Sequence, residues 1–214
     1  MRILCITNQL PYPVKSGASL RSYNLLYRMA KEHDIYLAAL SGLEDQGANV
    51  ARLQAFCQEV IGVKHKRQRG WGRIWKLFKH SWKKNPPNLS LAFSEELFKE
   101  IQNLVDRIDF DVVQIEHGTM GLYVQALPSV LRKRTAWILH DIDFEQLKQI
   151  SRLDPGIVTK ISTATLSAIM KKWQPNFAEM FGLCVVMSKN DQKLLLSAKN
   201  GLRVEVSPNG VDTK

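Results

Sequence analysis

The sequence predicts an α/β protein in which helices flank a parallel β-sheet. Short apolar runs rich in β-branched residues alternate with segments of helical periodicity along the 214 residues, which is the pattern of βα units. A chain of this length suits one large domain and can bury a sizeable core. We therefore expect one α/β domain over residues 1–206.

Composition excludes several other classes of protein. With 45% hydrophobic and 23% charged residues, the chain is typical of a globular protein and is neither disordered nor a disulfide scaffold. Its three cysteines form no CxxC pair and no Cys/His metal spacing, which predicts reduced thiols, no metal and a cytoplasmic protein. No apolar stretch reaches about 18 to 20 residues and no secretory signal opens the chain, so we expect neither a transmembrane helix nor secretion.

The predicted strands and two of the helices follow from local patterns. Ser94, followed by two glutamates, opens a helix with an apolar stripe, and Ser188 with Asp191 forms a capping box that opens another. The segments that we interpret as strands are 2–7, 35–40, 59–63, 111–116, 135–140, 183–187 and 203–207.

A long helix is predicted to begin at Asp154-Pro155. Proline is favoured in the first helical turn because its missing N–H has no partner there anyway. We expect the helix to continue until Pro175 interrupts it. Its apolar stripe comprises Ile157, Ile161, Ala164, Thr165, Ala168 and Ile169.

Nearly all of the excess positive charge lies in one window. The net charge is +10, and residues 64–84 hold nine Lys or Arg and no Asp or Glu, which leaves +1 for the rest of the chain. Charge concentrated in this way indicates a local surface for an anionic partner.

Helical periodicity divides that window into two faces. Trp71, Ile74, Trp75, Phe78 and Trp82 share one side, opposite Arg73, Lys76, Lys79, His80, Lys83 and Lys84. The pattern predicts a basic amphipathic helix on an anionic membrane surface. The alternative is a surface helix whose Trp face packs on the domain core. Nucleic acid is disfavoured, because no RNP, KH or helix-turn-helix signature accompanies the basic residues.

The loop between the first strand and the first helix, residues 8–21, ends in small residues at the start of the helix. Exposed N–H groups at a helix N-terminus bind phosphate or carboxylate groups, and glycine allows close approach. The loop has neither the GxGxxG nor the Walker pattern, which argues against NAD binding and ATP hydrolysis.

These features resemble the N-terminal half of a glycosyltransferase family 4 enzyme with the GT-B fold. The resembling segments lie in the family's order and span nearly the whole chain. They are Leu10-Pro11-Tyr12-Pro13, Ser16-Gly17-Ala18-Ser19-Leu20-Arg21-Ser22-Tyr23, Ile138-Leu139-His140-Asp141, Val185-Val186-Met187-Ser188 with Asp191, and Pro208-Asn209-Gly210-Val211-Asp212.

The resemblance implies two Rossmann-like domains that face a cleft, with the donor held mainly by the C-terminal one. This chain would be the Rossmann-like acceptor half, residues 207–214 would begin the interdomain linker, and the fragment would have little activity without the missing C-terminal domain. The complete enzyme would transfer a hexosyl group from a nucleotide-diphosphate sugar to a glycan or lipid-linked acceptor. It would retain configuration, need no metal or cofactor, and serve polysaccharide biosynthesis.

The resemblance also assigns roles to particular residues. His140 would be catalytic, beside the transferred sugar. The donor phosphates would meet Ser16, Gly17, Ala18 and Arg21. The acceptor pocket would include Glu116, His117, Asp141 and Asp143. Gln174 stands where relatives often have an acidic residue. Each role has an alternative interpretation. Gly17 and Ala18 could belong to an ordinary βα loop, Arg21 could be a surface residue, and His140 could be a strand-end histidine that bonds to its neighbours. The carboxylates could cap helices or lie in solvent.

Two other functions remain open from the sequence. One is a non-enzymatic Rossmann-like module that binds an anionic membrane, or RNA, through residues 64–84. The other is an enzyme of a different class on the same architecture, such as a nucleotide-sugar epimerase. The absent GxGxxG and YxxxK patterns argue against the epimerase.

Overall fold

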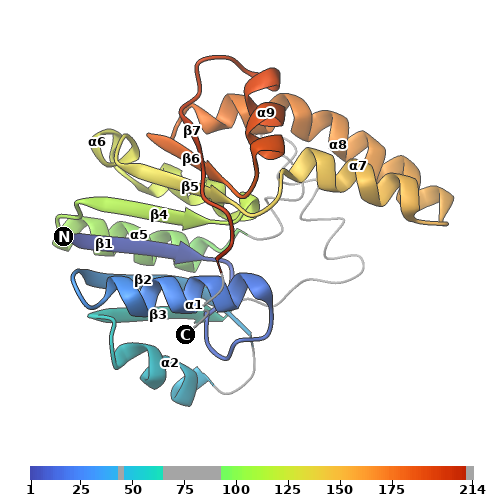
Figure 1. Ribbon diagram of the computed structural model, residues 1–214. Helices are drawn as coiled ribbons and strands as arrows, with labels where there is room; N and C mark the ends of the chain where they lie inside the picture. The colour runs from blue at the N-terminus through green and yellow to red at the C-terminus, as the bar shows by residue number, and fades with distance from the viewer. Residues whose placement is uncertain (43–45, 65–92, 211–214) are drawn as a thin grey trace.

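The computed structural model describes residues 1–42, 46–64 and 93–210 (Figure 1). In these residues the chain forms one seven-stranded sheet with the order β3-β2-β1-β4-β5-β6-β7, and all the strand pairs are parallel. The strands are β1 Arg2–Thr7, β2 Asp34–Ser41, β3 Glu59–Lys64, β4 Val112–Glu116, β5 Thr135–Leu139, β6 Leu183–Val186 and β7 Val204–Val206. All seven predicted strands are confirmed, with small shifts at their ends.

The strand order reverses beside β1. From β1 the chain moves outward through β2 to β3, then returns to β4 on the other side of β1 and continues outward to β7. Ile3 of β1 is accordingly paired with Ile35 of β2 on one side and with Val112 of β4 on the other. Such a reversal opens a crevice at the carboxyl ends of the two central strands, where open α/β sheets bind ligands.

Helices cover both faces of this sheet. They are α1 Gly17–Met29, α2 Gln46–Gln54, α5 Glu95–Arg107, the 3-10 helix η1 Gly118–Ala126, α6 Ser129–Arg132, α7 Asp143–Leu153, α8 Ile157–Ala178 and α9 Lys189–Ala198. Two predicted helix starts are confirmed: Ser94 accepts a hydrogen bond from Leu97 N–H, and Ser188 accepts one from Asp191 N–H at 3.1 Å.

The predicted ends of the long helix are wrong. α8 begins at Ile157, because the Asp154 carboxylate accepts the N–H of Gly156 at 2.8 Å and forms a turn around Pro155. The helix also continues through Pro175 to Ala178. Pro175 is buried, and the aromatic packing of the turn around it offsets the lost hydrogen bond, a cost of about 3 kcal/mol. α7 and η1 were not among the predicted elements.

Alternation along β1 separates two apolar cores. Ile3 and Cys5 face α1 and α2, where they pack with Leu26 and Leu53. Leu4 and Ile6 face the other side, where the core includes residues of α5, η1 and α8. Figure 1 shows α1 in front of the sheet and α5 behind it. Cys5, Cys57 and Cys184 are free and buried, and burial raises the pKa of each thiol, which makes them unreactive.

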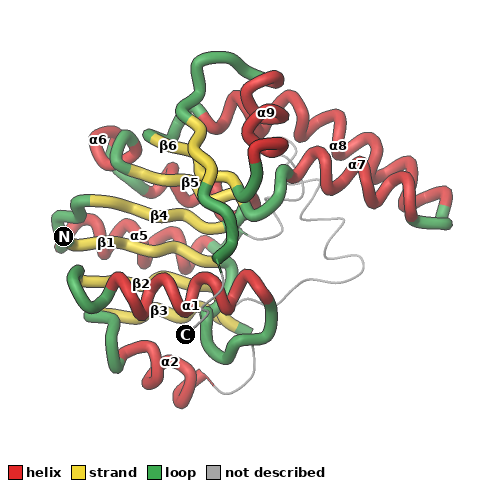
Figure 2. The backbone as a smooth tube through the Cα atoms, viewed as in Figure 1, coloured by secondary structure: helices red, strands yellow, loops and turns green. Residues whose placement is uncertain are grey.

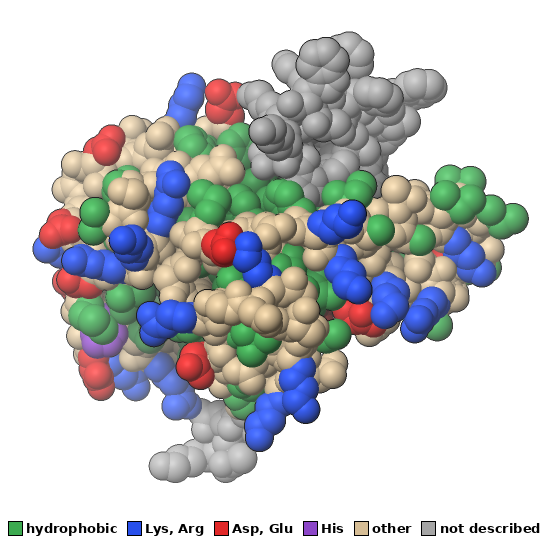
Figure 3. Space-filling view, turned by 90° about the horizontal axis from the view of Figure 1, so that it is seen from above, with side chains coloured by type: hydrophobic (Ala, Val, Ile, Leu, Met, Phe, Trp, Pro, Cys, Tyr) green, Lys and Arg blue, Asp and Glu red, His purple; other side chains and the backbone are tan. Residues whose placement is uncertain are grey.

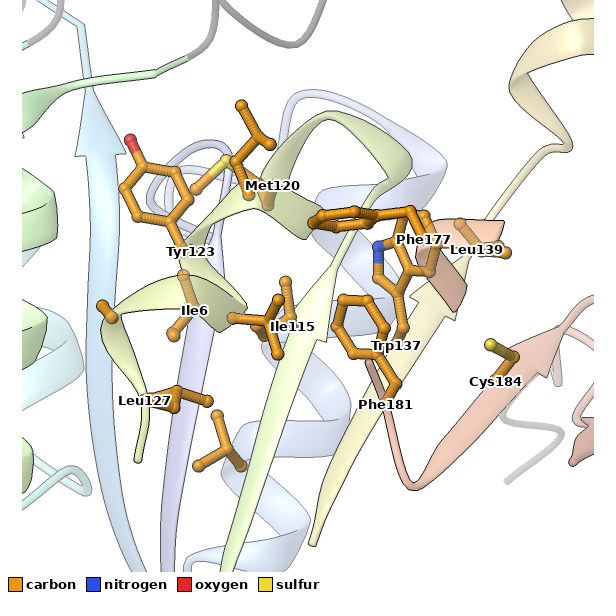
Figure 4. Packing of buried hydrophobic residues seen from close by; sticks show 14 of the residues in the cluster. Ile6, Ile115, Met120, Tyr123, Leu127, Trp137, Leu139, Phe177, Phe181 and Cys184 are labelled. Atoms are coloured by element: carbon orange, nitrogen blue, oxygen red, sulfur yellow. The ribbon is translucent and has the colours of Figure 1, made fainter. Parts of the chain in front are cut away.

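The larger core reaches the carboxyl end of the sheet through Trp137 of β5. Its indole is fully buried, stacks on Phe181 at 4.6 Å between ring centroids and meets Phe177 edge to face (Figure 4). The indole N–H donates a hydrogen bond of 3.1 Å to the carbonyl oxygen of His117. The core therefore fixes the backbone just beyond the end of β4.

Some predicted features lie outside the described residues. The basic segment is described only at Lys64, where β3 ends. Residues 71–84, with Trp71, Arg73, Trp75, Lys76, Phe78, Lys79, Trp82, Lys83 and Lys84, lie outside the described part, as does the end of the expected linker at 211–214. Among the described helices, none has the length and apolar character needed to cross a bilayer.

Candidate functional site

The candidate site lies at the carboxyl edge of the sheet, beside the point where the strand order reverses. Three of the connections that leave this edge carry candidate residues: residues 8–16 after β1, His117 after β4, and His140 after β5. Because neighbouring parallel strands end at the same edge, residues far apart in the sequence come together here.

Glu116 is the last residue of β4, and both oxygens of its buried carboxylate accept hydrogen bonds. It is 2% exposed and accepts hydrogen bonds from the Gln114 side chain, at 2.7 Å, and from the hydroxyl of Ser22 in α1. Burial by itself would raise the pKa of Glu116. Contacts with His140 and Ser22 outweigh that effect and lower the pKa, so the group is an anion at neutral pH.

His140 faces this carboxylate from the end of β5. Its Nε2 lies 3.7 Å from Glu116 Oε2, which is beyond hydrogen-bond distance but close enough for a strong attraction when the imidazole is protonated. This Nε2 is buried and has no hydrogen-bond partner in the described part of the chain. A buried ring nitrogen without a partner is ready to bond to a ligand.

His117 stacks on His140, with ring centroids 4.4 Å apart and planes inclined by 25°. Its backbone has φ 74° and ψ 144°, a conformation that non-glycine residues rarely adopt and that costs about 1–3 kcal/mol. Hydrogen bonds to Ile138 and from Trp137 hold that conformation. Burial and the adjacent His140 lower the pKa of His117 to about 4, so its ring is neutral at physiological pH.

Glu116, His117 and His140 offer three ligand atoms within 4.8 Å of one another, which is compact enough to surround a metal ion. Their geometry fits a metal poorly. An imidazole binds a metal in the plane of its ring, and two nearly parallel rings do not converge on one ion at the Zn–N distance of about 2 Å. The absence of a metal from the function stays a prediction.

A second carboxyl group lies beside the first cluster. Gln174 of α8 donates a hydrogen bond of 3.1 Å to Asp143 Oδ2 at the start of α7. The carboxyl packs directly on Gly118, where an added Cβ would lie 2.0 Å from Oδ2. Burial, followed by the charge of Asp141, raises the pKa of Asp143 to about 7. Asp143 is therefore partly protonated near neutral pH.

Three buried polar atoms in the described residues have no hydrogen-bond partner: Asn8 Oδ1, His140 Nε2 and Gln174 Oε1. Asn8 follows β1, His140 follows β5, and the Gln174 amide bonds to Asp143 just beyond His140. Native proteins satisfy nearly all their buried polar groups, so orphaned atoms at a ligand-binding edge indicate a polar ligand.

The predicted phosphate loop forms the start of α1. Ser16 is the N-cap, and its side chain and that of Ser19 each accept the other's backbone N–H, at 3.2 and 2.9 Å. Gly17 and Ala18 form the first turn, and Gly17 has open space where a Cβ would lie. This leaves an accessible helix N-terminus.

Arg21 is bound to the segment after β7. Its guanidinium donates to the Pro208 carbonyl oxygen at 3.1 Å, to Asn209 Oδ1 at 2.9 Å and to Ser207 Oγ at 3.2 Å. Figure 2 shows that segment running from β7 to α1. A phosphate at Arg21 would compete with these three contacts.

The structure thus brings Glu116, His117 and His140 together. It places Asp141 on the surface, with its carboxylate accepting a bond from Gln146 at 3.4 Å. Sequence reasoning missed the roles of Ser22 and Gln114. The buried residues Ser19, Ser22 and Leu26 share one face of α1, and this spacing was the available signal. Gln114 shares the face of Glu116 in β4 because strand side chains alternate.

No known protein-family profile matches the sequence, and no curated protein matches it significantly. Solved structures do match its fold. A sucrose-phosphate synthase from Thermosynechococcus elongatus matches with a TM-score of 0.55 at 10% identity, over 99% of this chain and 49% of that chain. The N-terminal domain of Candida albicans trehalose-6-phosphate phosphatase matches with a TM-score of 0.51 at 14% identity, over 99% of this chain and 49% of that chain.

A trehalose-phosphate synthase from Burkholderia xenovorans, solved with glucose-6-phosphate, matches with a TM-score of 0.47 at 14% identity, over 99% of this chain and 51% of that chain. At such identities the comparisons show the fold, a Rossmann-like sheet that matches the N-terminal half of GT-B glycosyltransferases. The chain spans about half the length of the solved structures that it matches. Membership of glycosyltransferase family 4 stays a prediction.

Proposed function

We propose that this chain is the acceptor-binding half of a glycosyltransferase that uses a nucleotide-diphosphate sugar. The observation that carries the proposal is the set of unpartnered buried atoms at the carboxyl edge, Asn8 Oδ1, His140 Nε2 and Gln174 Oε1. They offer acceptors and a ring nitrogen, the groups that bind sugar hydroxyls. The GT-B-like fold supplies the second line of support.

Each residue has a distinct task in this proposal. His140 is the residue that touches the transferred sugar. Glu116 is a positioning residue, because its oxygens are occupied by Ser22 and Gln114 and its charge faces His140. The neutral ring of His117 supports the His140 ring by stacking.

The leaving diphosphate would lie at the N-terminus of α1. There the exposed N–H groups beyond Ser16 and Gly17 stabilise the charge that develops as the sugar departs. The remaining donor contacts would come from a second domain. The complete enzyme would transfer a hexosyl group with retention to a glycan or lipid-linked hydroxyl in polysaccharide biosynthesis.

Ligand binding by this chain tests the proposal. Saturation-transfer NMR with UDP-, GDP- and ADP-sugars and with simple glycosides should show contacts between a ligand and the chain. The substitution His140→Ala should weaken the contact by about tenfold or more, since it removes a buried hydrogen bond. His33, a partly exposed histidine in the turn between α1 and β2, provides the matched control His33→Ala.

The result that would overturn the proposal is equally specific. If neither a nucleotide sugar nor a glycoside binds the chain, or if His140→Ala and His33→Ala bind equally well, the carboxyl edge is not a sugar site. A complete enzyme that carries His140→Ala and transfers sugar at the normal rate would also contradict the assigned role.

A further inference from the structure

The α7–α8 hairpin extends beyond the carboxyl edge of the sheet. α8 has 22 residues and is about 33 Å long, whereas the neighbouring strand β6 has four residues. The C-terminal half of α8 packs on the core through Met170 and Phe177. Its N-terminal half and α7 project away from the body of the protein (Figure 1).

This projecting part carries the most exposed aliphatic side chains of the described residues. Leu153 is 83% exposed, Val158 82% and Ile157 74%, and they lie on both sides of the turn between the helices. The set that we call the hairpin patch comprises Ile150, Leu153, Ile157, Val158, Ile161 and Ile169. Large apolar side chains gathered in this way mark an interaction site.

The hairpin patch shares Ile157, Ile161 and Ile169 with the apolar stripe that the sequence predicts for this helix. α8 has a second apolar side, with Leu166, Met170 and Phe177, and this opposite side packs on the core. At 3.6 residues per turn the two sides face in opposite directions. The helix is therefore apolar on two sides, and the described fold covers only one of them.

Positive charge accompanies the hairpin patch. α8 contains Lys160, Lys171 and Lys172 and no acidic residue, and Arg152 lies in the last turn of α7. Acidic residues of the hairpin are Asp143 and Glu145 at the start of α7, where Glu145 pairs with Lys148, and Asp154 in the turn. Figure 3 shows hydrophobic side chains at the far end of the hairpin and Lys and Arg side chains along it. Lysine stems lie along apolar surface while the ammonium groups reach anionic groups beyond it.

We propose that the hairpin patch binds the surface of an anionic lipid bilayer. All the residues of the patch except Ile169 lie near the end of a projecting hairpin, where a flat lipid surface can reach them. A second copy of the chain would bring together Arg152 and Lys160 of two hairpins, with Asp154 of the turn as the one acid between them in each hairpin. Aliphatic burial and the attraction of lysines to anionic headgroups act together at such a surface.

The hairpin begins beside the candidate site. α7 begins at Asp143, shortly after His140, so the hairpin leaves the sheet at the edge that holds the histidine pair. This inference is independent of sugar transfer.

Vesicle co-sedimentation of the whole chain tests the inference. Vesicles of phosphatidylcholine with about 30% phosphatidylglycerol should bind the chain, and pure phosphatidylcholine should bind it far less. The triple substitution Leu153→Gln, Val158→Gln, Ile161→Gln should reduce binding about tenfold or more. The matched control is Val130→Gln, which changes a 65% exposed aliphatic residue of α6.

A second pair of variants tests the charge. Arg152→Gln with Lys160→Gln should weaken binding to the anionic vesicles, whereas Lys193→Gln on α9 should leave it unchanged. Circular dichroism should show that the triple variant is folded, since its three residues are mostly exposed.

Three results would overturn the inference. The first is equal vesicle binding by the wild type and the triple variant. The second is binding that disappears only when Lys76, Lys79, Lys83 and Lys84 are neutralised, which would assign it to the basic segment. The third is a change from dimer to monomer in the triple variant with unchanged vesicle binding, which would make a second copy the occupant.

Discussion

His117 stacks on His140 at 4.4 Å between ring centroids, and it reaches this position with a backbone φ of 74°. The strained conformation predicts an unusual order of stability. The His117→Ala variant keeps a Cβ and therefore keeps the backbone strain. The His117→Gly variant removes both the Cβ and the strain. We expect the Gly variant to be more stable than the Ala variant by about 1–2 kcal/mol in urea unfolding. The control is His140, where φ is not positive and the Ala variant should be more stable than the Gly variant. If His117→Ala is at least as stable as His117→Gly, the backbone at position 117 is not strained.

The pH dependence of stability contains two opposing contributions. The pKa of His117 is lowered from 6.5 to about 4, so the unfolded state binds the proton more tightly and stability rises as the pH rises from about 4 to 6.5. The pKa of Asp143 is raised from 3.8 to about 7, so the folded state holds the proton and stability falls as the pH rises from about 3.8 to 7.

Single substitutions should reveal each contribution. In His117→Asn only the Asp143 contribution remains, so stability should fall as the pH rises from about 4 to 7. In Asp143→Asn only the His117 contribution remains, so stability should rise as the pH rises from about 4 to 6.5. The free energy of unfolding should change by about 1–3 kcal/mol over each pH range, because both side chains keep some solvent contact. Urea unfolding at a series of pH values measures both, and parallel curves for the two variants would refute the assignment.

Gly118 and Asp143 should be strongly coupled. A Cβ at position 118 would overlap the Asp143 carboxyl, so Gly118→Ala must displace that group and break its hydrogen bond with Gln174. We expect Gly118→Ala to cost about 2 kcal/mol or more, and much less when Asp143 is already alanine. Gly17→Ala, which has open space, is the control. Additive effects in the double-mutant cycle would mean that the two residues do not meet.

The sequence predicted the sheet well because each buried strand carries its own pattern. Apolar runs such as the one around Cys5 and that around Val113 mark a strand without knowledge of its neighbours. The course of the long helix was harder to predict. Pro175 was expected to interrupt it, yet the packing of Phe177 and neighbouring aromatic rings keeps the helix continuous.

The candidate site was predictable only in part. The sequence pointed to Glu116, His117 and His140, because each lies at the end of a strand or directly after it. The link from Ser22 to Glu116 joins a helix and a strand that lie far apart in the sequence, and no local pattern reveals which serine of α1 faces β4. The stacking of the two histidines likewise depends on the pairing of β4 with β5 and on one positive φ.

Arg21 should control the segment that follows β7. Its guanidinium bonds to Ser207, Pro208 and Asn209, and only the planar fork of arginine can make the three bonds together. Arg21→Lys should therefore release the segment almost as fully as Arg21→Gln. Hydrogen exchange at the amides of residues 207, 209 and 210 should become faster in both variants. Global stability should fall by about 1 kcal/mol or less, because the bonds are exposed.

The same exchange measurement tests the proposed phosphate contact of Arg21. A nucleotide diphosphate that draws the guanidinium toward the N-terminus of α1 must break its bonds to Ser207 and Asn209. Adding the nucleotide to the wild type should then accelerate exchange at the same amides as Arg21→Gln, and adding it to the variant should change nothing further. Arg28, about two turns further along α1, provides the control Arg28→Gln. Unchanged exchange in the nucleotide-bound wild type would mean that Arg21 stays on the segment after β7 and that the diphosphate binds without it.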